Sequence, residues 1–99
     1  MDLQKQAQAA FEKIIEHGPS STLRKAAKSY WSAYQSAEGA DDKTRSLLDT
    51  AIKSIPVDYR SPALQCLEAC DAGKAKGDNV DECYLALAIC LAERIVHVM

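Results

Sequence analysis

The stretch that decides the fold is "CYLALAICLAERIVHVM", residues 83–99. Its residues 83–92 carry no charge and no strongly polar side chain. Ten helical residues rise only about 15 Å, half of the roughly 30 Å hydrocarbon thickness of a bilayer. Glu93 and Arg94 interrupt the run before it could be extended across a membrane. The segment therefore predicts a helix that is covered by protein and not by lipid.

Helical periodicity places apolar residues on two nearly opposite sides of this segment. One stripe holds Val80, Tyr84, Leu87, Leu91 and Val98, and the other holds Leu85, Ile89 and Val96. A helix that is apolar on all sides usually lies in the middle of a domain, and this is the interpretation we favour. The alternative is that the second stripe forms a seam between subunits of a homodimer, or a groove for a partner, because monomers rarely expose such a stripe.

The remainder of the chain is also predicted to be helical. Apolar periodicity marks segments at about residues 2–17, 21–38, 42–55 and 62–72, before the final helix from about residue 80. No alternating run of β-branched and aromatic residues indicates a strand. With 99 residues, the chain is expected to form one domain. We predict an all-α, compact bundle of four to five helices with the hydrophobic C-terminal helix at its centre.

The expected helix boundaries rest on capping residues. Gly18 is expected to end the first helix in a left-handed conformation, and Pro56 to end the third. Ser61 and Pro62 suit the N-cap and the first position of the fourth helix. Asn79, followed three residues later by glutamate, forms a capping-box pattern at the start of the fifth.

The net charge and the N-terminal segment bear on the partners and the location of the protein. Twelve basic and fourteen acidic residues give a net charge of −2, which favours neither nucleic acid nor any other charged partner. The start "MDLQKQAQAAFEKII" is amphipathic and lacks the features of a secretory signal. We therefore expect a cytoplasmic, reducing location, in which the four cysteines are thiols.

The cysteines raise the question of a metal site. Cys83, Cys90 and His97 recur every seven residues, and Cys66 and Cys70 are four apart. Residues seven apart on a helix are separated by about 10.5 Å, too far to share one zinc ion. We expect no metal and no cofactor, and interpret the thiols as small buried groups between the fourth and fifth helices, where Cys70 approaches Cys83. A thiol or metal sensor built on Cys66, Cys70 and Cys83 remains an alternative.

Catalytic chemistry has little support in the sequence. No phosphate-binding glycine loop, HExxH or GxSxG motif is present. His17 lies where a helix is expected to end, and His97 lies two residues from the C-terminus, so neither suits a general base. We predict a protein without enzymatic activity.

A second informative stretch surrounds Trp31. On the helix at 21–38, Trp31 falls at the border of the apolar face, with Arg24, Lys28 and Gln35 beside it. Tryptophan and arginine are enriched at binding hot spots, so this edge is a candidate partner-binding surface. The same pattern would arise if the indole covered the edge of the core and the basic side chains stacked over it. Both interpretations stay open.

We therefore expect a small non-enzymatic protein–protein interaction module that acts as a regulator, adaptor or inhibitor of a larger protein. Small chains without catalytic groups include modulators carried by phages and other mobile elements. The partner is unidentified, and a second copy of the chain is one candidate. A nucleic-acid-binding transcriptional regulator that uses Arg24, Lys25 and Lys28 is the main alternative, although the overall charge disfavours it.

Overall fold

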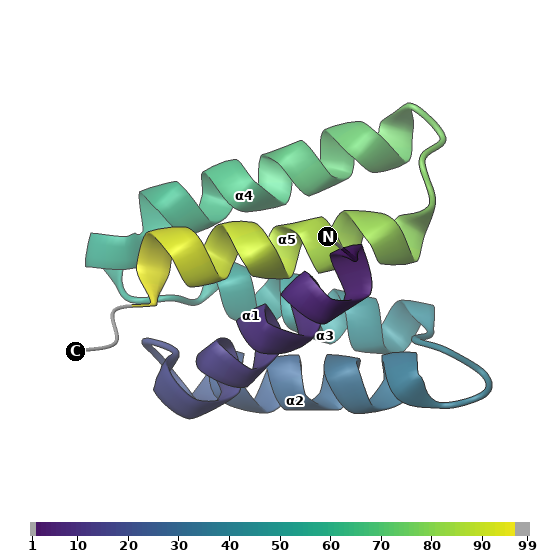
Figure 1. The fold of residues 1–99 in the computed structure, drawn as a ribbon. Coiled ribbons are helices and arrows are strands. Elements are labelled where there is room, and N and C mark those ends of the chain that lie inside the picture. Colours follow the sequence, from purple (N-terminus) through teal and green to yellow (C-terminus); the bar gives the residue numbers. More distant parts are fainter. Residues whose placement is uncertain (1, 97–99) are drawn as a thin grey trace.

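The computed structural model describes residues 2–96, and helices dominate this part of the chain. The helices are α1 (Leu3–His17), α2 (Ser21–Gln35), α3 (Asp42–Lys53), α4 (Val57–Ala75) and α5 (Val80–Ile95) (Figure 1). No strand occurs within residues 2–96, so the all-α prediction is confirmed. None of the five helices combines the length and the apolar character needed to cross a membrane. His97 and Val98 lie outside the described residues.

Four of the helices begin at a side-chain cap. Asp2, Ser20, Asp41 and Asn79 each accept a hydrogen bond from a backbone N–H in the first turn, at 2.8–3.1 Å. The cap expected from the sequence at Asn79 is thus confirmed. The backbone N–H and the hydroxyl of Thr44 both donate to Asp41, and these bonds lower the pKa of its carboxyl group.

Gly18 ends α1 for a different reason from the expected one. Its φ of −58° is not left-handed, so that prediction is wrong. A Cβ at this position would lie 2.6 Å from the carbonyl oxygen of Ile14. Glycine is needed here because the chain leaves the helix in close contact with its last turn.

The fourth helix is longer than predicted at both ends. It begins at Val57, with Pro56 as its N-cap, and it contains Pro62 within the helix. A proline at this position removes one hydrogen bond to the carbonyl group four residues earlier, that of Asp58. Asp58 is exposed, so water can satisfy its carbonyl group, while Ala63 and Leu67 beyond the proline are buried. The segment "IPVDYRSP", residues 55–62, therefore forms mainly the first turns of α4.

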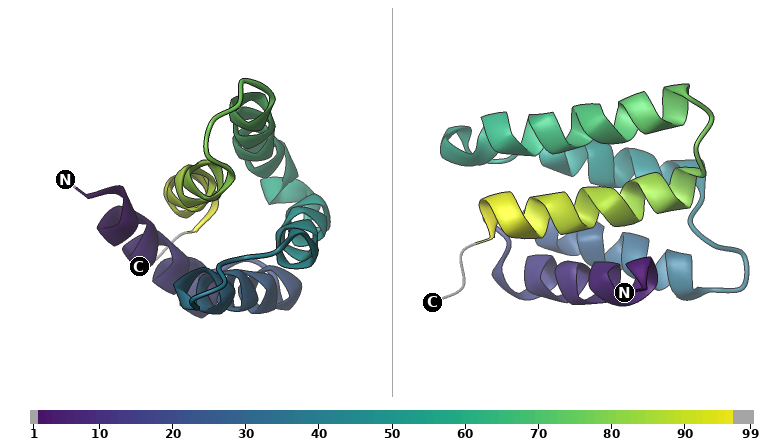
Figure 2. Two further views of the ribbon diagram at one scale, coloured as in Figure 1. Left: turned by 90° about the vertical axis from the view of Figure 1, so that its right-hand side faces the viewer. Right: turned by 45° about the horizontal axis from the view of Figure 1, so that its top comes forward.

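The other four helices are arranged around α5. Viewed from one end, α1, α2, α3 and α4 follow one another in an arc, and α5 lies within that arc (Figure 2). The neighbour of α5 along the chain, α4, runs antiparallel beside it (Figure 1). The predicted central position of the C-terminal helix is confirmed.

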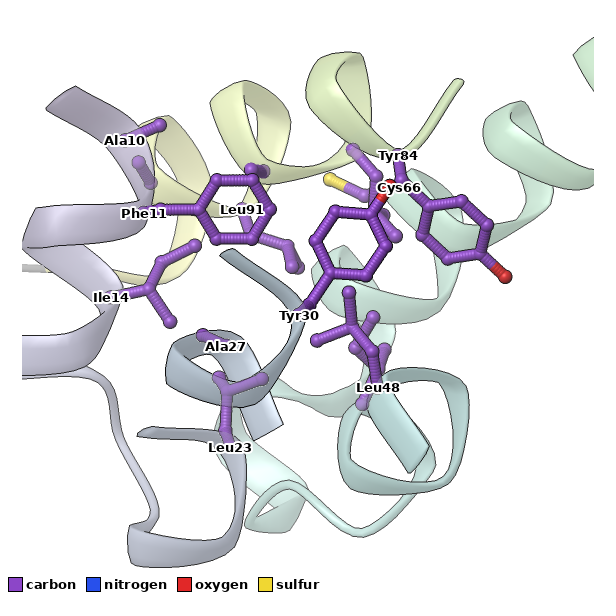
Figure 3. Packing of buried hydrophobic residues seen from close by; sticks show 14 of the residues in the cluster. Ala10, Phe11, Ile14, Leu23, Ala27, Tyr30, Leu48, Cys66, Tyr84 and Leu91 are labelled. Carbon is purple, nitrogen blue, oxygen red and sulfur yellow. The ribbon is translucent and has the colours of Figure 1, made fainter. Parts of the chain in front are cut away.

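Aromatic rings fill the space beneath α5. Phe11 stacks on Tyr30 with their ring centroids 5.4 Å apart, and Tyr30 lies 5.2 Å from Tyr84. All three side chains are at most 1% exposed. Figure 3 shows the three rings in a row, with Leu91 beside Phe11 and Leu48 beneath the tyrosines. Helices α1, α2 and α5 thus share a continuous aromatic core.

The second apolar stripe of α5 is mostly covered by the chain itself. Leu85 is 1% exposed and Val96 is 8% exposed, and only Ile89 reaches the surface in part. The exposed residues of α5 are Glu82, Ala86, Glu93 and Arg94. The stripe therefore does not form a continuous exposed seam.

Leu85 provides a test of this central placement. Replacement of Leu85 by alanine is expected to lower the free energy of unfolding by about 2–5 kcal/mol, because it leaves a cavity in the core. The matched control is Leu47→Ala in α3, where the side chain is 49% exposed. This control is expected to change the stability by no more than about 0.5 kcal/mol. Urea denaturation measures both, and equal effects would contradict the central position of α5.

Candidate functional site

Trp31 lies half-buried on the outer side of α2. Its indole stacks on the buried ring of Phe11 at 5.2 Å and on the half-buried ring of Tyr34 at 5.5 Å. Within residues 2–96, no acceptor is paired with the indole N–H of Trp31, and this nitrogen is not enclosed by the protein. The indole is thus fixed by two ring contacts, and its N–H is left without a partner in this part of the chain.

A groove of about 560 Å³ lies beside this indole, between the start of α1 and the end of α2. We call it the Trp31 groove, and it is lined by Asp2, Gln4, Lys5, Gln8, Trp31, Tyr34 and Gln35. The Gln4 side-chain amide donates to the hydroxyl of Tyr34 at 3.0 Å and joins the two walls. The lining therefore combines two aromatic rings with three amide groups and one residue of each charge.

The structure assembles only part of the site that the sequence predicts. Trp31 and Gln35 both line the groove. Arg24 lies nearer the start of α2, where its guanidinium group donates to the carbonyl oxygen of Gly18 at 2.7 Å. Lys28 lies between them on the helix and is exposed. Arg24 is thus engaged in closing the end of α1 rather than in bordering the indole.

Sequence reasoning missed Tyr34 and Gln4 as members of this site. Tyr34 belongs to the apolar face of α2, but it lies one turn after Trp31, and this spacing was an available signal. Gln4 comes from a different helix, and nothing local to it in the sequence indicates that it meets Tyr34.

Two buried tyrosines bring polar groups into the core, and each donates to a carboxylate. The hydroxyl of Tyr30 donates to Asp81 at 3.1 Å, and Arg45 donates to the same carboxylate oxygen at 3.2 Å. Burial, together with the charge of Asp81, raises the pKa of Tyr30. This phenol therefore stays protonated and links α2, α3 and α5.

Tyr84 forms the second of these links. Its hydroxyl donates to Asp49 at 3.0 Å and accepts a hydrogen bond from Lys74 at 3.2 Å. The Lys74 ammonium group also lies 5.0 Å from the centre of the Tyr84 ring. Burial raises the pKa of Tyr84 to about 12, an effect that Lys74 partly opposes. The phenol is thus a structural donor that joins α3, α4 and α5 at neutral pH.

All four cysteines line one cavity between α4 and α5, which has a volume of about 240 Å³. We call it the cysteine cavity. Cys66 and Cys90 are joined by a disulfide with their Cα atoms 5.8 Å apart. The expectation that all four cysteines are thiols is therefore wrong, although their place between these two helices was predicted correctly.

The antiparallel register explains this pairing. Seven residues beyond Cys66 on α4 is Gly73, and seven residues before Cys90 on α5 is Cys83. A Cβ at Gly73 would lie 2.9 Å from the Cys83 sulfur, so these two positions also face each other. Cys70 is three residues from the level of Cys83, about 4.5 Å along the helix axis. The cysteines at 66 and 90 are level with each other, and those at 70 and 83 are not.

The other two cysteines are free and buried. Cys70 is 5% exposed and Cys83 is 8% exposed. Burial raises the pKa of Cys70 to about 12, so this thiol stays protonated at neutral pH. Within residues 2–96, no three histidine, cysteine or acidic side chains are grouped so that they could hold a metal ion. The disulfide therefore divides the expected sensor set into one bonded cysteine, Cys66, and two buried thiols, Cys70 and Cys83.

Ile89 lies in a different groove, of about 410 Å³, between α1 and α5. We call it the Ile89 groove, and it is lined by Lys5, Gln6, Ala9, Ala10, Lys13, Ile89, Ala92 and Glu93. Leu85 and Val96, the other members of the expected seam, do not line it. Its floor is apolar, with lysines on the α1 side and a glutamate on the α5 side.

Comparison with protein-family models, with curated proteins and with solved structures finds no match for this chain.

The raised pKa of Tyr84 predicts a loss of stability in alkali. In the unfolded chain, the phenol has a pKa of 10.0, so it releases its proton while the folded protein still holds it. The unfolded state then binds fewer protons, and stability falls as the pH rises from about 10 to about 12. We expect Tyr84→Phe to show a smaller drop in unfolding free energy than wild type between about pH 8 and about pH 11. Urea denaturation at both pH values measures this, and an equal drop would contradict the assignment.

Proposed function

We propose that the chain is a small non-enzymatic protein–protein interaction module whose partner binds at the Trp31 groove. In this proposal it acts as a regulator, adaptor or inhibitor of a larger protein. The observation that carries the proposal is an indole that is fixed by Phe11 on one side and bordered by a groove on the other. Tryptophan and tyrosine are the residue types that most often dominate binding energy.

The rigid position of the Trp31 indole favours binding. Trp31 stacks on both Phe11 and Tyr34, so little side-chain freedom remains to be lost when a partner arrives. Ordering a free side chain at an interface costs about 0.5–1.5 kcal/mol, and preorganised rings avoid much of this cost.

The polar lining of the groove suits a polypeptide better than a polyanion. Gln4, Gln8 and Gln35 offer amide groups that can both donate and accept, which matches the alternating donors and acceptors of a peptide backbone. The charges of Lys5 and Asp2 offset each other. The groove therefore has no strong electrostatic preference.

The nucleic-acid alternative has less support. It depends on Arg24, Lys25 and Lys28 acting together as phosphate ligands, yet the guanidinium group of Arg24 is bound to Gly18. Two exposed lysines on a chain of net charge −2 provide a weak basic surface.

A second copy of the chain is the other candidate partner, and the Ile89 groove favours it. A twofold axis near Ile89 would bring the lysines of one copy towards Glu93 of the other, over an apolar floor. We expect a homodimer of this kind to become monomeric when Ile89 is replaced by glutamate, without loss of helix content. Light scattering gives the mass in solution, and a wild-type monomer at high concentration would exclude the homodimer.

A cytoplasmic location is part of the same proposal. In that location, the disulfide would have to be transient. Disulfides persist in oxidising compartments, whereas in the cytoplasm they are usually transient. In the cytoplasm, the bond between Cys66 and Cys90 would therefore be one that forms and breaks.

Trp31→Ala tests the interaction proposal. Affinity capture with wild-type protein is expected to retain a specific partner that the variant loses by a factor of at least about ten, as expected for a hot-spot residue. Gln35→Ala, on the groove wall, should weaken the same partner to a smaller extent. Leu47→Ala removes a 49% exposed side chain from α3 and is the matched control.

Circular dichroism must show that each variant keeps its helix content. Retention of the same partners by folded Trp31→Ala protein would contradict the proposal, as would their loss from Leu47→Ala.

A further inference from the structure

We propose that Cys90 is a site of reversible thiol exchange, at which a small thiol from solvent binds covalently in the cysteine cavity and releases Cys66. The ligand class is a low-molecular-weight thiol such as glutathione. This site is separate from the Trp31 groove, because the two are lined by different residues and lie between different helices.

The two cysteines of the disulfide differ in their exposure to solvent. Cys66 is 1% exposed, whereas Cys90 is partly exposed on α5. The lining of the cavity includes the exposed residues Ala69, Ala86 and Glu82, so the cavity opens at the surface. An incoming thiolate therefore reaches the sulfur of Cys90 first, and the sulfur that is attacked decides which cysteine leaves.

The exchange balances without any added oxidant. The sulfur of the small thiolate attacks the sulfur of Cys90 and forms a new sulfur–sulfur bond with it. The bond between Cys66 and Cys90 breaks, and its electron pair leaves on Cys66, which takes a proton from water. The small thiol is thereby oxidised to the disulfide level and Cys66 is reduced to a thiol.

The same geometry makes the reaction reversible. The Cα atoms of Cys66 and Cys90 are 5.8 Å apart in the folded chain, within the usual range of about 4.4–6.8 Å for a disulfide. As long as α4 and α5 keep their register, Cys66 remains beside Cys90. Cys66 can then attack Cys90 and expel the small thiol, which restores the original bond.

The two free cysteines do not compete in this exchange. Cys70 and Cys83 line the same cavity, but both are buried. Burial raises the pKa of Cys70 to about 12, so this thiol stays protonated at neutral pH. Only the thiolate attacks a disulfide, so Cys70 is inert at neutral pH.

Trapping the adduct tests the assignment. In Cys66→Ser protein, Cys90 has no partner, so oxidised glutathione is expected to leave one glutathione attached to Cys90. In Cys90→Ser protein, the buried Cys66 should react at least about ten times more slowly, because its thiolate is shielded. The matched control is the Cys70→Ser/Cys83→Ser double variant, which keeps the disulfide and should exchange as wild type does. Acid quenching followed by intact mass and peptide mapping gives the site and the rate.

Wild-type protein provides the same information without a cysteine variant. A short pulse of reduced glutathione, followed by an alkylating quench, should yield the glutathione adduct on Cys90 and the alkyl group on Cys66. The proposal is overturned if the adduct lies on Cys66, if Cys70 or Cys83 is modified as fast as Cys90, or if no adduct forms in either experiment.

Discussion

The structure depends on the covering of α5 by the chain's own helices. The residues of α5 are apolar around most of its circumference, so packing against a single helix would leave several apolar side chains exposed to water. Helices α1 and α4 lie along its two sides, and the side chains of α2 and α3 reach it from below through Tyr30 and Asp49. Each larger apolar side chain of α5 that is fully buried stabilises the fold by about 1.5–3 kcal/mol. The narrow strip of α5 that stays exposed carries charged and small residues.

The same constraint explains the buried tyrosines. A core that is closed around one helix leaves few positions for polar atoms, and each phenol in it requires a partner. The rings of Tyr30 and Tyr84 contact each other. The hydroxyl of Tyr30 donates to Asp81 at the start of α5, and that of Tyr84 donates to Asp49 on α3. Arg45 donates to the carboxylate of Asp81, and Lys74 donates to the hydroxyl of Tyr84. The Tyr30 link sets which faces of α2 and α5 meet, and the Tyr84 link fixes α5 against α3 and α4. Apolar contacts alone would specify these faces less strictly.

Much of the fold could be predicted from the sequence, because it follows from local signals. The apolar character of residues 83–92 placed the last helix at the centre, and Asn79 marked the start of that helix. The start of α4 could not be predicted, because Pro62 is a strong local signal that buried contacts further along the helix outweigh. Gly18 shows the same limit, since its role depends on a close approach that no propensity describes.

The candidate sites were less predictable, because they depend on how helices meet. Trp31 and Gln35 line one groove, because they lie on the same face of α2. Arg24 instead donates a hydrogen bond to the carbonyl oxygen of Gly18. The disulfide had a readable signal, since Cys66 and Cys90 are equally far from Asp78 in the turn between α4 and α5. Interpreting the cysteines by compartment rather than by this symmetry led to the wrong expectation.

Hydrogen exchange of the backbone amides measures the central claim most directly. If α5 is enclosed by the other four helices, its amides between Leu85 and Leu91 open only when the whole protein unfolds. They should then be the slowest in the chain, with a free energy of opening equal to that of global unfolding. Faster exchange in this segment than in α1 or α2 would show that α5 detaches from a core that persists without it, and would contradict the account.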